Sequence, residues 1–135
     1  MGLFSILDIS AAGMDVQQQR LETAALNLAN SQTTAGADGE GYKPLTVVVR
    51  STLDASSLPR PVAVEWAQQN VAPRMVYDPG HPDADERGFV TMPGVDPVGS
   101  MMDLLTISRS YEANLRAFDV TRALLQRTLD IGSRR

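Results

Sequence analysis

The sequence lacks cysteine entirely, and it is poor in histidine, lysine and aromatic residues. Its 135 residues include no Cys and a single His, while aromatic residues make up 5% of the chain. The absence of cysteine excludes disulfides, thiol nucleophiles and thiolate metal sites. With His81 alone, no pair of histidines can bind a metal, and a Ser-His-Asp triad has only one candidate base.

The charge balance also excludes some classes of partner. The formal net charge is −4 and the pI is about 4.8, so we expect no nucleic-acid binding, which requires a clustered positive surface. No run approaches the roughly 18 apolar residues of a membrane span, so we expect no direct membrane insertion. The first fifteen residues have no basic region and their apolar run is interrupted, so we expect no cleaved signal peptide.

The N-terminal segment, residues 3–30, has the pattern of an amphipathic helix. It contains no proline, and its apolar residues recur seven positions apart. This spacing keeps them on one side of a helix, where they can pack against a partner helix. Taken alone, such a stripe favours an ordinary amphipathic helix on a globular core. The stripe consists of Leu7, Met14, Leu21 and Leu28, with Ala11 and Ala25 between them.

The C-terminal segment, residues 100–131, gives a stronger helical signal, since it has neither glycine nor proline. Asp96 and Pro97 stand where an N-cap and a first-turn proline are expected. Further apolar residues, among them Leu105, Val120 and Leu124, point away from the main stripe, which predicts more than one neighbour. The stripe steps by three and four through Met101, Leu104, Ser108, Tyr111, Leu115, Phe118, Arg122, Leu125 and Leu129.

Between the two helices, residues 31–97 contain all eight prolines and short strand-like runs. The runs cover residues 42–50, 61–66, 71–77 and 88–92, and Pro44 and Pro73 within them indicate edge strands. We therefore predict an α+β fold. Residues 1–30 and 98–135 form a terminal helical domain packed as an antiparallel coiled coil, and residues 31–97 form a small β-rich module with long loops.

Two segments contain residue types that could support chemistry. The acidic residues around His81 fail the EF-hand pattern, because Arg87 and Gly94 occupy positions that require oxygen ligands. The glycine-rich segment 36–41 follows a helix and precedes a strand, the reverse of a phosphate-binding loop. We therefore expect no enzyme, metal or cofactor. A small hydrolase centred on His81, Asp78 and Asp83 is the enzymatic alternative.

Four stretches resemble the axial proteins of the bacterial flagellar rod and hook. Residues 3–10 and 26–30 are similar to the N-terminal motif of that family, and residues 108–114 to its C-terminal motif. Residues 77–93 resemble the signature segment of one proximal-rod member rather than of its sister rod proteins. The chain departs from the family pattern at Gly94, Asp119 and Arg122, where Asn, Asn and Lys are usual.

The resemblance implies a structural subunit of the proximal rod, the periplasmic drive shaft of the flagellar basal body. Its expected partners are other rod subunits, its own copies in a helical assembly, and the flagellar type III export apparatus. Another rod or hook protein, or a helical module docking one partner, are the alternatives. Stripes and motifs together predict a subunit interface of Leu7, Met14, Leu21, Asn27, Leu28, Asn30, Met101, Leu104, Leu105, Arg109, Tyr111, Asn114, Leu115, Phe118, Arg122, Leu125 and Leu129.

Overall fold

The computed structural model describes residues 3–35, 41–50 and 63–132. Two long helices enclose four short strands in chain order, so the fold is α+β, as the sequence predicts. The elements are α1 (Leu3–Ala29), β1 (Leu45–Arg50), β2 (Ala63–Gln68), β3 (Arg74–Tyr77), β4 (Phe89–Met92) and α2 (Pro97–Gly132).

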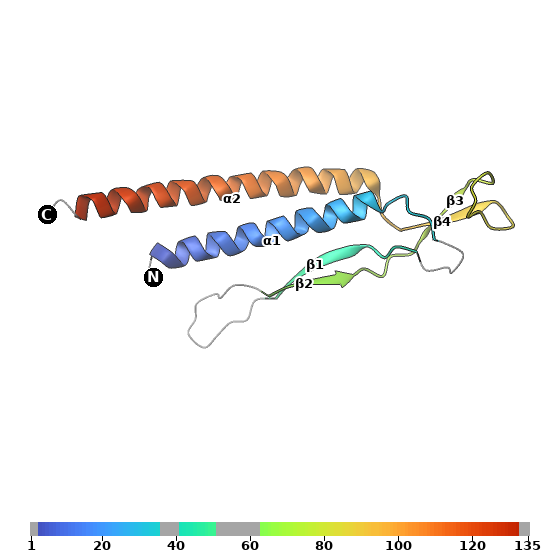
Figure 1. Ribbon diagram of the computed structural model, residues 1–135, viewed down its shortest axis with the longest axis horizontal. Coiled ribbons are helices and arrows are strands. Elements are labelled where there is room, and N and C mark those ends of the chain that lie inside the picture. Colours follow the sequence, from blue (N-terminus) through green and yellow to red (C-terminus); the bar gives the residue numbers. More distant parts are fainter. Residues whose placement is uncertain (1–2, 36–40, 51–62, 133–135) are drawn as a thin grey trace.

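The two helices lie side by side and run in opposite directions (Figure 1). They contain 27 and 36 residues, or about 40 and 54 Å at 1.5 Å per residue. Asp96 caps α2 as predicted, because its carboxylate accepts hydrogen bonds from the backbone N–H groups of Val98 and Gly99, both at 3.1 Å. Pro97 is the first helical residue, where its missing N–H costs nothing.

The strands form two separate antiparallel hairpins. In the first, β1 pairs with β2, with Leu45 opposite Gln68 and Val47 opposite Trp66. In the second, β3 pairs with β4, with Tyr77 opposite Phe89. Each sheet has only two strands, so every strand is an edge strand and one face of each hairpin needs cover from elsewhere.

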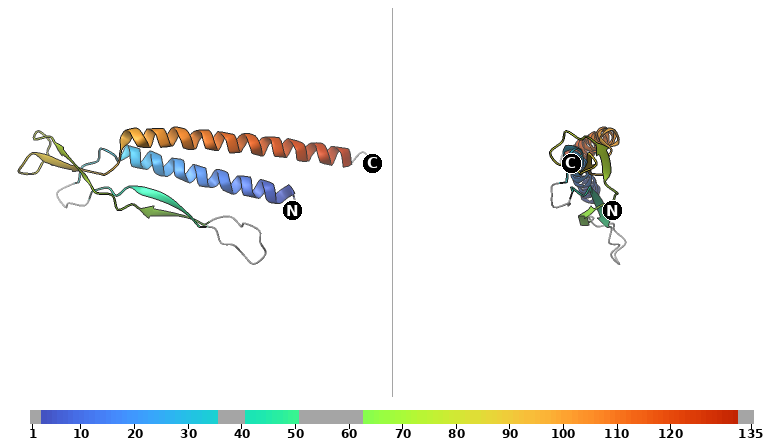
Figure 2. Two further views of the ribbon diagram at one scale, coloured as in Figure 1. Left: turned by 180° about the vertical axis from the view of Figure 1, so that it is seen from behind. Right: turned by 90° about the vertical axis from the view of Figure 1, so that its right-hand side faces the viewer.

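Helix α1 is the middle layer of the molecule. Helix α2 lies along one side of it and the β1–β2 hairpin along the other, while the β3–β4 hairpin extends from the far end (Figures 1 and 2). On the hairpin side of α1, Thr23 is only 4% exposed and its hydroxyl donates to the carbonyl oxygen of Gln19. Two sides of α1 are therefore covered by other elements of the same chain.

The hydrophobic core is very small. Among the described residues, the buried apolar side chains are Val90 (0% exposed) and Val95 (7% exposed), together with Pro44 and Pro93. Val90 and Val95 lie where the β3–β4 hairpin joins the segment leading into α2. The β1–β2 hairpin adds little to this core, and Trp66 on β2 is 48% exposed. No helix in the described part of the chain is long and apolar enough to cross a membrane.

Candidate assembly surface

Contact between the two helices uses the residues that repeat every seven positions. On α1, Leu7, Met14, Leu21 and Leu28 are all half-buried, and on α2 the same is true of Leu104, Tyr111, Phe118 and Leu125. These residues form the centre of both stripes predicted from the sequence. Packing the two helices together therefore covers one line of side chains on each.

The positions between these lines differ from the sequence prediction. Ala11 and Ala25 on α1, and Met101, Leu115 and Leu129 on α2, are exposed. Between two residues seven positions apart, the next inward-facing residue can lie three or four positions along the helix. The apolar residues of the sequence favour the fourth position, whereas the structure uses the third. The residues turned inward instead are Ser10, Gln17 and Ala24 on α1 and Ile107, Asn114 and Thr121 on α2, of which all but Ile107 are small or polar.

This offset places Asn114 of α2 beside Gly13 of α1. A Cβ atom built on Gly13 would lie 4.0 Å from the side-chain Nδ2 of Asn114. Asn114, which the sequence assigned to a subunit interface, therefore lies against the partner helix of its own chain. Arg109 and Arg122, assigned to the same interface, are exposed on α2, so Arg122 does not lie in the contact between α1 and α2.

Helix α2 is the least covered element of the structure. None of its described residues is buried, and large apolar side chains are exposed along its length. A solvent-exposed helix normally carries polar residues on all sides but one. Its exposed apolar residues are Val98, Met101, Met102, Leu105, Leu115, Val120, Leu124, Leu129 and Ile131, with exposed fractions from 41% to 73%.

Asn27 joins α1 to the first strand through its side-chain amide. Its Nδ2 donates to the carbonyl oxygen of Leu45, and its Oδ1 accepts from the N–H of Leu45 and from the hydroxyl of Tyr42, each at 2.8 Å. The N–H of Gln69 donates to the carbonyl of Pro44, so the next peptide groups, those of Leu45, point away from β2. Asn27 thus pairs with the free edge of β1.

Tyr42 completes this contact and was not singled out in the sequence. Its hydroxyl is partly shielded by the surrounding chain, and this burial raises its pKa above the ordinary value of 10.0. Asn30 behaves differently, because its Nδ2 donates to the carbonyl of Leu26 in its own helix at 2.9 Å. The two asparagines of the N-terminal motif therefore have separate structural roles.

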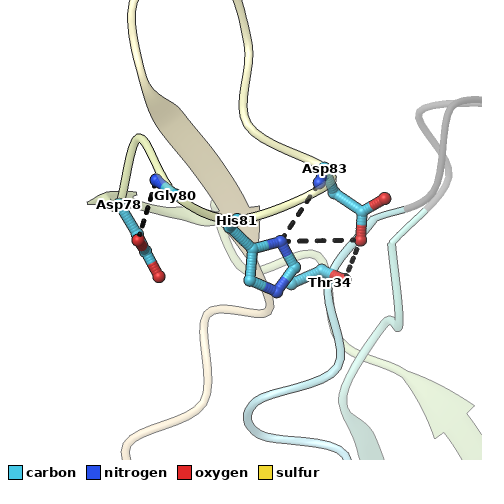
Figure 3. Close-up of polar contacts among 5 residues, drawn as sticks. All are labelled: Thr34, Asp78, Gly80, His81 and Asp83. Atoms are coloured by element: carbon cyan, nitrogen blue, oxygen red, sulfur yellow. Dashed lines mark hydrogen bonds and ion pairs between the residues drawn. The ribbon is translucent and has the colours of Figure 1, made fainter.

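The residues of the alternative hydrolase site form a turn (Figure 3). The carboxylate of Asp78 accepts from the N–H of Gly80 at 3.3 Å, and the backbone N–H of Asp83 donates to Nδ1 of His81 at 3.1 Å. The hydroxyl of Thr34 donates to Oδ2 of Asp83 at 2.6 Å. These side chains stabilise the loop and attach it to the segment that follows α1.

Asp85 has a similar role at the start of β4. Its Oδ1 accepts from the N–H groups of Arg87 (2.9 Å) and Phe89 (2.8 Å). Gly88 between them has a φ of 81°, a conformation that favours glycine. In the described residues, no group of three or more His, Asp or Glu side chains is arranged to hold a metal ion.

Known proteins resemble this chain over nearly its whole length. Residues 86–131 match the family described as "Flagellar basal body rod FlgEFG protein C-terminal". The chain is 38% identical over 133 residues to the flagellar basal-body rod protein FlgC of Escherichia coli O157:H7, covering 98% of this chain and 99% of the relative. It is 40% identical over 132 residues to the FlgC of Aquifex aeolicus (96% and 97% covered). It is 32% identical over 149 aligned residues to that of Bacillus subtilis (98% and 99%). The chain therefore belongs to the family of flagellar basal-body rod proteins FlgC, and it is a structural rod protein and not an enzyme.

Proposed function

We propose that this protein is a subunit of the proximal rod that assembles, with other rod subunits and copies of itself, into the tubular drive shaft. In this assembly it transmits torque and surrounds the export channel. The observation that carries the proposal is the exposure of α2, a helix of 36 residues of which none is buried. A helix with apolar residues on several sides requires several neighbours, and α1 supplies only one.

The exposed surface supports the same proposal quantitatively. A compact monomer of 14.6 kDa exposes about 6,900 Å², whereas this chain exposes 10013 Å². The excess of about 3,100 Å² is enough for several interfaces of the usual size, which bury about 800 Å² on each partner. Burial of this surface on assembly would supply the hydrophobic stabilisation that the small core lacks.

The predicted interface residues divide between contacts within and between chains. Those on the central lines of the two stripes pack inside the subunit, as a short antiparallel coiled coil. We assign the contacts between subunits to the residues that remain exposed beside these lines, Met101, Leu105, Leu115, Arg122 and Leu129. Arg122 is a polar residue beside the seam, and such residues typically set register and partner choice. The terminal helices would form the tube wall, with the middle module outside it.

Family membership also supports a periplasmic position within the basal body, reached through the flagellar type III export apparatus. Secretion of the chain by cells with a functional apparatus, and its retention in the cytoplasm when that apparatus is inactivated, would test the route. Equal amounts outside the cytoplasm in both strains would contradict it.

Substitutions at the exposed α2 residues test the assembly proposal. Leu105→Glu and Leu129→Glu each place a charge on a side chain that is 62% or 69% exposed, so the helices should still form. We expect both variants to lose copurification with other rod subunits and to fail to restore motility to cells lacking their own protein. Gln68→Glu, an equal charge change at an exposed position of β2, is the control and should restore motility.

Two outcomes would contradict the proposal. Normal motility with Leu105→Glu and Leu129→Glu would show that this side of α2 faces no neighbour. A finite one-to-one complex with a single partner in solution, and no higher assembly, would favour the helical binding module instead.

A further inference from the structure

The outer face of the β3–β4 hairpin is apolar and exposed. Met75, Tyr77 and Phe89 share this face, since Tyr77 lies opposite Phe89 and two positions from Met75. They are 53%, 65% and 37% exposed. The opposite face carries Val90, which is fully buried. The hairpin therefore uses one face for the core and leaves an aromatic face open.

The two rings of this face are held in a fixed arrangement. The ring centroids of Tyr77 and Phe89 are 5.3 Å apart with an angle of 65° between the planes, an edge-to-face contact. The hydrogen bonds of Asp85 fix the loop that connects the strands. A rigid aromatic pair loses little conformational entropy when a partner covers it, and such residues dominate the energy of many interfaces.

The loop beside these rings is acidic. Residues 78–87 carry four carboxylates and one arginine, Arg87, which gives a charge of −3 with His81 neutral. All four carboxylate residues are exposed, and they are Asp78, Asp83, Asp85 and Glu86. We call the aromatic face and this loop the tip. A partner that complements the tip must present apolar side chains together with positive charge.

The other end of the same molecule presents this combination. Val120, Leu124, Arg127 and Ile131 follow one another at steps of four, three and four, so they form a single stripe along α2. The three apolar residues are 61%, 58% and 73% exposed, and Arg127 is also exposed. This stripe lies on the side of α2 away from Leu125, which packs toward α1.

We propose that the tip of one copy binds the stripe of a second copy, with Arg127 beside the acidic loop and against the face of an aromatic ring. A guanidinium group in this position gains from both the carboxylates and the ring electrons. The tip and the C-terminal end of α2 lie at opposite ends of the elongated molecule (Figures 1 and 2). The contact is therefore heterologous and does not close on itself, so it produces a linear array.

This contact is independent of the rod interface proposed above, because Val120, Leu124 and Ile131 lie on a different side of α2 from Leu115 and Leu129. A motility assay therefore does not test this contact. The test is the self-association of the purified full-length chain, measured by sedimentation across a range of protein and salt concentrations. We expect association that increases with protein concentration and weakens as salt screens the charges.

Charge exchange between the two ends gives the decisive experiment. Glu86→Arg makes the acidic loop less complementary to Arg127, and Arg127→Glu does the same from the other side. Each variant alone should associate at least about tenfold more weakly than the unmodified chain. An equimolar mixture should associate again, because the altered loop of one variant complements the altered stripe of the other.

A matched aromatic pair of variants tests the rings. Tyr77→Ala should weaken association, whereas Trp66→Ala removes an aromatic residue that is 48% exposed on the other hairpin and should not. The circular dichroism of every variant is compared with that of the unmodified chain. No association of the unmodified chain, or no recovery in the mixture of correctly folded variants, would overturn the proposal. Binding of the tip only to a different rod subunit would overturn the second copy as its partner.

Discussion

Replacing Asn27 by alanine should separate the β1–β2 hairpin from α1. The substitution removes three hydrogen bonds of 2.8 Å, two of them to the backbone of Leu45 and one to the hydroxyl of Tyr42. A hydrogen bond contributes about 0.5–1.5 kcal/mol net. Since these groups are only partly buried and water replaces some of the bonds, we expect a loss of about 2 kcal/mol in the free energy of unfolding.

The size of this loss sets the expected measurements. For 135 residues, with an unfolding entropy of about 2.1 cal/mol/K per residue, 2 kcal/mol corresponds to a fall in Tm of about 7 °C. The backbone amide of Leu45 should also exchange its hydrogen about thirtyfold faster, if its protection depends on Asn27. Thermal unfolding followed by circular dichroism, at one fixed protein concentration, and hydrogen exchange followed by NMR measure the two effects.

Asn30→Ala is the matched control, because Asn30 lies near the same helix end and bonds to the carbonyl of Leu26 within its own helix. The substitution removes two exposed local bonds, the one to Leu26 and one of 3.3 Å from the hydroxyl of Thr33, and should lower Tm by no more than about 2 °C. Equal effects of the two substitutions, or an unchanged exchange rate at Leu45, would refute the role assigned to Asn27.

Four further substitutions test separate features. Asp96→Ala removes the N-cap of α2 and should cost about 1 kcal/mol in chemical denaturation, with reduced helicity by circular dichroism; an unchanged midpoint would contradict the capping role. Gly94→Ala should destabilise by about 1–3 kcal/mol, since its Cβ would clash with the carbonyl oxygen of Ala72. Gly13→Ala, by contrast, has room and should stabilise α1 by about 0.5–1 kcal/mol, so a reversed order of the two denaturation midpoints would be inconsistent with this packing. The raised pKa of Tyr42 means that the folded state favours the neutral phenol. The contribution of Tyr42 to the free energy of unfolding is therefore intact below pH 10.0 and is lost as the pH rises through the higher pKa of the folded state. Tyr42→Phe should therefore show a smaller fall in stability above pH 10.0 than the unmodified chain, and an equal fall would exclude this group as the cause.

The sequence predicted the parts of the structure that depend on local pattern. Both helices, the cap at Asp96 and the four strand regions follow from periodicity, from capping chemistry and from the positions of proline. Each of these features depends on residues close together in the chain, and the sequence shows such relationships directly.

Contacts between distant segments were harder to predict. The offset of the two stripes depends on whether Asn114 or Leu115 faces α1, and hydrophobicity alone favours Leu115. In the structure Asn114 lies beside Gly13 of α1. The pairing of Asn27 with the edge of β1 depends on a contact across 18 positions of sequence, which no periodic pattern encodes.

The small core has a consequence for where the stability of this protein resides. With Val90, Val95 and two prolines as the buried apolar side chains among the described residues, the isolated chain has little hydrophobic free energy to lose on unfolding. Neighbouring subunits would bind only the folded state, so they would raise its apparent stability as their concentration increases. Its melting temperature would then be a property of the number of neighbours present, low for a single copy and high for a copy surrounded on every side.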